Sequence, residues 1–164
     1  MKPGEPARTV AQNDHELVLT KLLDAPVSLV WEAWTDPERI AQWWGPRGFS
    51  TRVVEMDLRP GGVWRYVMSG PDGKEYPVSG EFREVTPMRR IVTTDWFDEG
   101  FEYPVEDLPR GIVTTVHFEE VGDRTRVTLV IEHPSAADRE KHEKMGVVEG
   151  WGSSLDRLVE HLSA

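Results

Sequence analysis

The 164-residue sequence contains no cysteine. Disulfide bonds, thiolate metal sites and thiol nucleophiles are therefore excluded, and this composition is typical of a reducing compartment. The histidines do not replace the missing metal ligands, because no pair has the spacing of two ligands on one helix face. We expect no metal site among the five histidines, which are His15, His117, His133, His142 and His161.

Basic residues are scarce as well. Nineteen Lys and Arg oppose 29 Asp and Glu, which gives a formal net charge of −10. The densest basic runs are single pairs such as Arg89–Arg90, so no basic stripe offsets the acidic balance. We therefore expect the chain to bind neither nucleic acid nor an anionic membrane surface.

Long apolar runs are also missing. The N-terminal residues contain no stretch that resembles a signal peptide or a membrane span, so we expect a cytoplasmic protein. We expect residues 1–14 to form a flexible tail and residues 15–164 to form one domain, since the length suits a single core.

The first ordered elements are predicted to be one strand and two short helices. Apolar residues alternate from His15, with Leu17, Leu19 and Leu22 as the inward candidates, and this pattern indicates a strand of about eight residues. The spacing then becomes helical from Val27. A cap at Asp36 before Pro37 predicts that this helix stops and a second short helix begins.

Between Ser50 and Ile131 the apolar period becomes two, which predicts consecutive antiparallel hairpins. Turn signals interrupt the pattern at residues 60–62, 70–74, 86–89 and 121–125. In the segment GGVWRYVM, Trp64, Tyr66 and Met68 share one face, which we expect to be buried, while Arg65 lies on the exposed face.

The C-terminal segment after Pro134 predicts one long amphipathic helix. Ser135 is a capping residue, and apolar residues recur at three and four positions as far as Leu162. Three glycines, Gly146, Gly150 and Gly152, weaken this helix. The predicted fold is α+β: a curved antiparallel sheet of about six to seven strands wrapped around the terminal helix, with two short helices after the first strand.

Four stretches in this order resemble one known family. They are APVSLVWEAWTDPERIAQWWGPRGF, DLRPGGVWRYVMSGPDGKEYPVSGEFREVTP, GDRTRVTLVIEH and GWGSSLDRLVEHL. Together they resemble the bacterial branch of the family named for the activator of the Hsp90 ATPase, within the START-like (SRPBCC) helix-grip superfamily. The resemblance covers nearly everything from His15 to Leu162. It implies a cavity between the sheet and the terminal helix, and no cofactor.

The resemblance does not carry chaperone activation with it. The eukaryotic co-chaperone has an additional N-terminal domain that is involved in contacting the chaperone, and we expect no such domain here. For most bacterial members the resemblance implies no established activity.

Four of the seven tryptophans fall between Trp31 and Trp44. We expect Trp34 and either Trp43 or Trp44 to close one end of the grip by packing, while the remaining indole edges line the mouth of the cavity.

Two superficial motifs have simpler explanations. GPDGK joins two strands and lacks the spacing of a phosphate-binding loop, so a hairpin turn explains it. GWGSSL lies inside the terminal helix with no paired base nearby, so it is not a nucleophile elbow. Residues 97–110 form a long acidic connection with three aromatic residues, which favours either a lid or a solvated surface loop.

Three functions stay open on the sequence. The first is a binding protein for a small apolar or aromatic ligand. The second is an enzyme of the polyketide cyclase or dehydratase kind, with a cavity histidine (His117 or His133) and Tyr66 or Tyr76 as acid and base. The third is a protein-interaction module of the co-chaperone kind. An enzyme needs two or more titratable groups facing one void, whereas an interaction module exposes its tryptophans.

We expect a monomer or a homodimer, and no catalytic residue is assigned. As isolated residues, the two cavity histidines are more typical of hydrogen-bonded scaffold than of catalysts. The predicted cavity lining is Trp34, Trp64, Tyr66, Met68, Tyr76, Phe82, Trp96, His117, His133, Met145, Trp151 and Leu155.

Overall fold

The computed structural model describes residues 8–9 and 13–163. Its strands are β1 (Arg8–Thr9), β2 (Glu16–Leu23), β3 (Ser50–Met56), β4 (Val63–Ser69), β5 (Glu75–Thr86), β6 (Arg90–Phe97), β7 (Ile112–Val121) and β8 (Arg124–Glu132). Its helices are α1 (Val27–Thr35), α2 (Pro37–Trp43), α3 (Ala136–Lys144) and α4 (Val147–Ser163), with a short 3-10 turn at Val105–Asp107.

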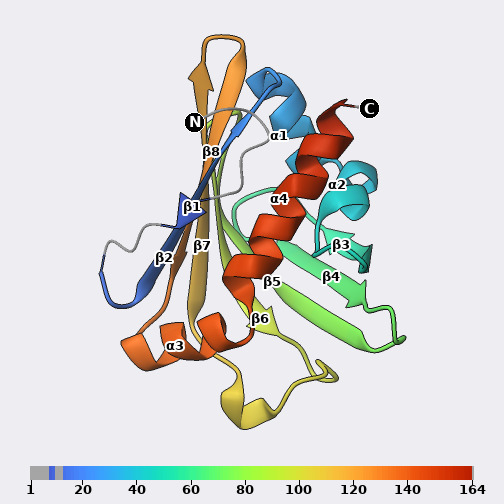
Figure 1. The fold of residues 1–164 in the computed structure, drawn as a ribbon, viewed down its shortest axis with the longest axis vertical. Helices are drawn as coiled ribbons and strands as arrows, with labels where there is room; N and C mark the ends of the chain where they lie inside the picture. The colour runs from blue at the N-terminus through green and yellow to red at the C-terminus, as the bar shows by residue number, and fades with distance from the viewer. Residues whose placement is uncertain (1–7, 10–12, 164) are drawn as a thin grey trace.

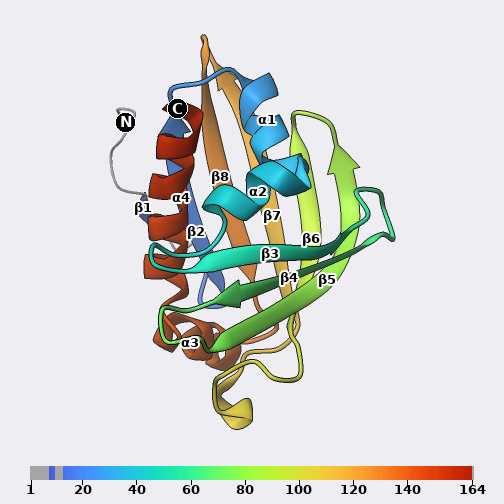
Figure 2. The same cartoon turned by 90° about the vertical axis from the view of Figure 1, so that its right-hand side faces the viewer.

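The strands form one antiparallel sheet in the order β1-β2-β8-β7-β6-β5-β4-β3. Consecutive strands from β3 to β8 pair with each other: four of the five pairs are hairpins closed by the predicted turns, and β6 and β7 are joined by a long loop. The sheet curves around α4, and α1 and α2 lie over one end of it (Figures 1 and 2). The predicted helix-grip fold is confirmed.

The core lies between the concave face of the sheet and the C-terminal half of α4. Val127, Leu129 and Ile131 of β8 alternate with partly exposed residues and are at most 1% exposed. Leu155 and Leu158 of α4 are fully buried against this face. None of the helices within residues 13–163 has both the length and the apolar character needed to span a membrane.

The predicted tail, residues 1–14, lies mostly outside the described residues. Within it, Arg8 and Thr9 pair with Thr20 and Leu19 as the two-residue edge strand β1.

The C-terminal segment contains two helices, so the prediction of one continuous helix is wrong at its start. α3 ends at Lys144, and Gly146 adopts a positive φ of 87° before α4 begins at Val147. A left-handed residue ends a helix because the next turn cannot follow the same axis. Ser135 caps α3 as predicted, since its hydroxyl accepts a hydrogen bond from the backbone N–H of Asp138.

The inner face of β2 also differs from the prediction. Leu17, Leu19 and Leu23 join the core, and Lys21 shares their alternation and is completely buried. Leu22 is buried on the opposite side of the strand. Lys21 is tolerated there because its ammonium lies 3.5 Å from the carboxylate of Asp156 on α4.

Trp64 is the largest side chain on the inner face of β4 and is 6% exposed. Its indole N–H donates to the carbonyl oxygen of Thr94, 3.2 Å away, across the intervening strand β5. The residue paired with Trp64 on β5 is Gly80, where a Cβ atom would lie 1.7 Å from the same carbonyl oxygen. Glycine at this position therefore permits both the close strand approach and the indole hydrogen bond.

We predict that Trp64→Ala lowers the free energy of unfolding by about 3 kcal/mol, because it removes a buried ring and a hydrogen bond. Arg65→Ala on the exposed face of the same strand should change it by less than about 0.5 kcal/mol. Urea unfolding of both variants measures the difference. Similar small effects at both positions would contradict the assigned faces of β4.

Candidate ligand-binding cavity

A cavity of about 410 Å³ lies between the sheet and the first half of α4. Its wall comes from β4 to β7, the segments that follow α2 and β6, and the α3–α4 junction. Most of this wall is apolar. Nine aromatic residues line it: Trp44, Phe49, Trp64, Tyr76, Trp96, Phe97, Phe101, Tyr103 and Trp151.

The cavity exists because α4 presents little bulk to the sheet at this end. Gly146 and Gly150 both line the space, and a Cβ atom built on Gly150 would have no other atom within 4 Å. One turn further along, Ser154 and Leu155 are buried, so the helix closes on the sheet there. The half of α4 that contains the glycines therefore leaves a void next to the sheet, whereas the half that contains the leucines packs against the sheet.

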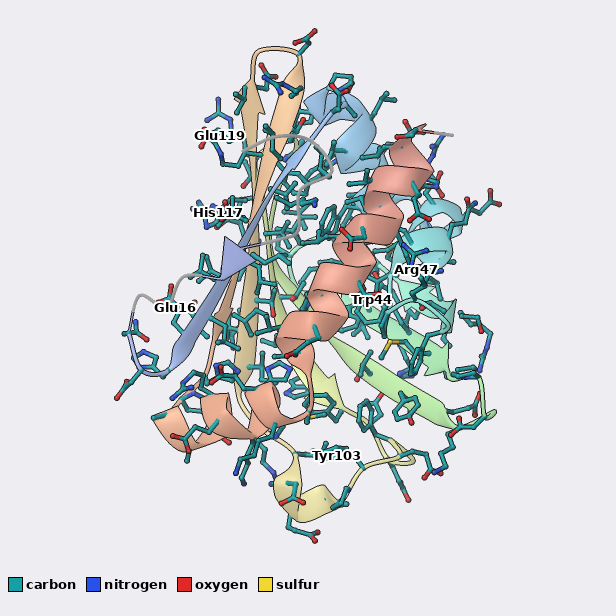
Figure 3. The ribbon with its side chains drawn as sticks, viewed as in Figure 1. Glu16, Trp44, Arg47, Tyr103, His117 and Glu119 are labelled. Carbon is teal, nitrogen blue, oxygen red and sulfur yellow. The ribbon has the colours of Figure 1, made fainter. Side chains whose placement is uncertain are left out.

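The segment after α2 forms one side of the mouth, and α4 holds it in place. The hydroxyl of Ser154 accepts a hydrogen bond from the backbone N–H of Gly45 (3.1 Å), and Ser153 accepts one from Arg47 (2.7 Å). Trp44 lies beside α4 in this arrangement (Figure 3). The guanidinium of Arg157 donates to four carbonyl oxygens at the end of α2 and in this segment, those of Gln42, Gly45, Pro46 and Phe49.

The long connection between β6 and β7 closes another side. The ring of Phe101 packs edge-on against Tyr76 and Phe97, at centroid distances of 5.2 and 4.8 Å. Tyr103 lies on the side of the loop that faces the sheet and α4 (Figure 3) and lines the cavity. The loop is thus docked through its aromatic residues. Whether it opens as a lid stays a prediction.

Asp95 is the one charged side chain deep in the wall. The hydroxyl of Thr93 donates to one carboxylate oxygen at 2.8 Å, and the hydroxyl of Thr114 on β7 donates to the other. Burial raises the pKa of Asp95 to about 6, and these two hydrogen bonds limit the rise. The side chain keeps some accessible surface because the cavity opens onto it.

A second, smaller cavity of about 70 Å³ lies behind the first. The two share five wall residues: Trp44, Trp64, Asp95, Thr114 and Trp151. Tyr66 lines only the smaller one, and burial, followed by the charge of Asp95, raises the pKa of its phenol. Tyr66 therefore stays neutral and is a poor source or acceptor of protons.

His142 of α3 lines the large cavity and is held from behind by His133. The ring nitrogens His133 Nε2 and His142 Nδ1 are 2.9 Å apart, and His133 Nδ1 lies 2.8 Å from the carbonyl oxygen of His15. Burial, and to a smaller extent the charge of His133, lowers the pKa of His142 to about 3. Burial also lowers the pKa of His133. Both rings are therefore neutral near pH 7.

The structure places most of the predicted lining residues at one of the two cavities. The large one is lined by Trp64, Met68, Tyr76, Trp96, Met145 and Trp151. The small one is lined by Trp34, Tyr66 and Phe82, together with Trp64 and Trp151. Trp34 also packs against the fully buried Trp43 at 4.5 Å, so these two rings close the end of the grip.

Three predicted lining residues lie elsewhere. His117 is on the convex face of the sheet, on the side away from α4, with Glu119 (Figure 3), because its strand buries the alternate residues Val116 and Phe118. Leu155 is fully packed in the core. His133 is buried, but it reaches the cavity only through the ring of His142.

Asp95 and His142 line the cavity and were not predicted. Asp95 could have been predicted from the sequence. It alternates with Ile91 and Phe97 along β6 and is therefore a charged residue on the inward face of the strand. His142 could not have been predicted in this way, because α3 has almost no apolar stripe that would identify its buried side. Within residues 8–9 and 13–163, no three His, Asp or Glu side chains are grouped to hold a metal ion.

Comparison with known proteins shows what the chain resembles. Residues 24–163 match the model of the family "Activator of Hsp90 ATPase homolog 1-like protein". A crystal structure from Mycobacterium smegmatis is 31% identical, with 96% of this chain and 98% of that chain covered and a TM-score of 0.84. One from Nitrosomonas europaea is 32% identical, with 93% and 97% covered and a TM-score of 0.78.

A structure described as the AHSA1 protein from Silicibacter pomeroyi is 26% identical, with 90% of this chain and 97% of that chain covered and a TM-score of 0.69. The search of curated proteins gave no match. These findings confirm the family resemblance, with a matched range that begins nine residues after His15.

We predict that Asp95→Asn raises the free energy of unfolding by about 2 kcal/mol above pH 7. The pKa of Asp95 is higher in the folded chain, about 6, than in an unfolded chain. The ionised carboxylate therefore lowers the free energy of unfolding. That penalty is absent below about pH 4, where the carboxyl is protonated in both states. The gain should therefore shrink as the pH falls from 7.5 to 4.5.

Denaturant unfolding of both proteins at several pH values measures this, and the difference between them cancels the titration of the histidines. Glu120→Gln, at an exposed carboxylate of β7, is the control and should show no such gain. A loss of stability in Asp95→Asn that is equal at every pH would contradict the raised pKa.

Proposed function

The chain belongs to the Activator of Hsp90 ATPase homolog 1-like family, and we propose that it is a binding protein for a small apolar or aromatic molecule. The observation that carries this proposal is the cavity of about 410 Å³ with nine aromatic residues in its wall. Ligand pockets in proteins are concave, mostly apolar and of about 300–1,000 Å³, with a few convergent polar groups. Asp95, Thr114 and His142 are such groups.

The burial of the tryptophans weighs against the protein-interaction alternative. Six of the seven are buried or partly buried, and Trp96, which is 48% exposed, stands at the rim of the cavity. A surface built to dock a protein would gather exposed apolar residues into one patch. The aromatic residues of this chain instead converge on an internal space.

We predict that Gly150→Leu weakens ligand binding by at least about tenfold, because the new side chain enters open space that the ligand occupies. The probe is N-phenyl-1-naphthylamine, a neutral aromatic dye whose fluorescence reports transfer to an apolar site. Wild-type protein should bind it saturably, with quenching of tryptophan fluorescence. The melting temperature should rise, since binding to the folded state alone adds about 2.7 kcal/mol at a hundredfold excess over Kd.

Gly152→Leu is the matched control. Gly152 lies on the same helix with equally open surroundings, but it does not line the cavity. Both substitutions improve helix propensity by a similar amount, so their stabilities should match. Equal affinities in the two variants, or no saturable binding to the wild type, would contradict the proposed function.

A second candidate function, catalysis by proton transfer on a polyketide-like aromatic substrate, rests on one observation. Asp95 and His142 are titratable groups that face the same cavity. Asp95, with a pKa of about 6, is mostly ionised near pH 7 and is suited to take a proton from a substrate. His142, with a pKa of about 3, would orient the substrate by accepting a hydrogen bond, and His133 holds its ring in place.

If this second function holds, Asp95→Asn should reduce kcat at least about a hundredfold and leave the dissociation constant of a neutral substrate nearly unchanged. The amide has nearly the shape of the carboxylate but cannot take a proton from a substrate. Product formation and binding are measured separately. Bound substrates that are never converted by the wild type would leave binding as the sole function.

A further inference from the structure

The charged side chains in the wall of the large cavity are all acidic. Two carboxylates line it, Asp95 deep in the wall and the exposed Glu102 at the mouth. The lining residues, all within the described part of the chain, include no Lys or Arg. A ligand that brings a carboxylate or phosphate would therefore meet like charge and no cation.

The hydrogen-bonding pattern makes His142 a further acceptor. The carbonyl oxygen of His15 can only accept, so the Nδ1 of His133 carries the hydrogen in this pair. Neutral His133 then accepts at Nε2 from the Nδ1–H of His142. The remaining nitrogen of His142, Nε2, is left with a lone pair and no hydrogen.

Asp95 carries a charge that the protein does not neutralise. Its partners are the hydroxyls of Thr93 and Thr114, and no basic side chain among the described residues offsets its charge. The hydrogen of Thr114 is used in this bond, so the hydroxyl offers a ligand only lone pairs. The N–H of Trp64 is likewise used by the carbonyl of Thr94.

The aromatic wall adds a second attraction for positive charge. Trp44 contacts both Trp64 and Trp151 edge-on, at centroid distances of 6.4 and 6.1 Å, and these three indoles also line the void on which Asp95 opens. Indole faces carry negative electrostatic potential and attract organic cations, more strongly when water is excluded. The net charge of −10 draws cations toward the mouth.

We propose that the cavity selects organic cations: molecules with an apolar or aromatic body and a protonated amine that pairs with Asp95. This inference rests on the proposed binding function and names its ligand class. The amine donates to the carboxylate of Asp95 and the aromatic body fills the space beneath α4. Fatty acids and other apolar anions are excluded by charge.

The test uses three ligands with one body and different charge: 1-naphthylmethylamine, 1-naphthylmethanol and 1-naphthoic acid. Each displaces N-phenyl-1-naphthylamine from the full chain at pH 7.5. The amine should bind at least about tenfold more tightly than the alcohol, and the acid more weakly than either. In Asp95→Asn the amine and the alcohol should bind within about threefold of each other. Glu120→Gln removes one charge outside the cavity and should keep the full preference.

The outcomes separate this inference from the function on which it rests. Equal binding of all three ligands, or tightest binding of the acid, overturns the cation selectivity and leaves the binding function standing. An amine preference that survives in Asp95→Asn overturns the role of Asp95. Failure of the dye and all three ligands to bind the wild type overturns the binding function itself.

Discussion

Burial of the concave face of the sheet beneath a single helix is the constraint on which the rest of the structure depends. Leu155 and Leu158 bring the second half of α4 into full contact with the sheet. Arg157, between them, holds the end of α2 and the segment after it against the same helix through four carbonyl oxygens. One helix cannot follow a curved sheet along its whole length, so contact at one end separates the surfaces at the other. The cavity follows from this geometry, and Gly146 and Gly150 keep it open.

Most of the fold could be predicted from the sequence because local patterns and the global fold agree. The period-two segments, their four turns and the cap before Pro37 all occur where the pattern predicts them. The prediction was wrong where one residue has two possible roles. Gly146 inside a helical pattern either weakens the helix or ends it, and only the positive φ that it adopts in the folded chain distinguishes the two. Lys21 was missed because its partner, Asp156, lies on a distant helix.

The candidate site was less predictable, since a cavity is a property of several elements at once. Large aromatic residues on an inward face, such as Trp64, could be assigned by parity. His117 was misplaced because a histidine suits either face of a strand, and only the burial of Val116 and Phe118 beside it settles the matter. His142 reaches the cavity through the break between α3 and α4, which the sequence pattern does not predict. The alternation along the strand that placed Trp64 on the inward face also places Asp95 there.

The structural contacts of Asp95 do not require a carboxylate at this position. Its hydrogen bonds to Thr93 and Thr114 join β6 to β7, but an amide of the same shape would make comparable contacts without the desolvation of a charge. A carboxylate there lowers the stability of the folded chain near neutral pH, because burial raises its pKa to about 6. Strained or unfavourable groups of this kind are found where a protein uses them for binding or chemistry. The same cavity that exposes this charge also surrounds it with indole rings, so a bound cation would satisfy the carboxylate and the aromatic wall together.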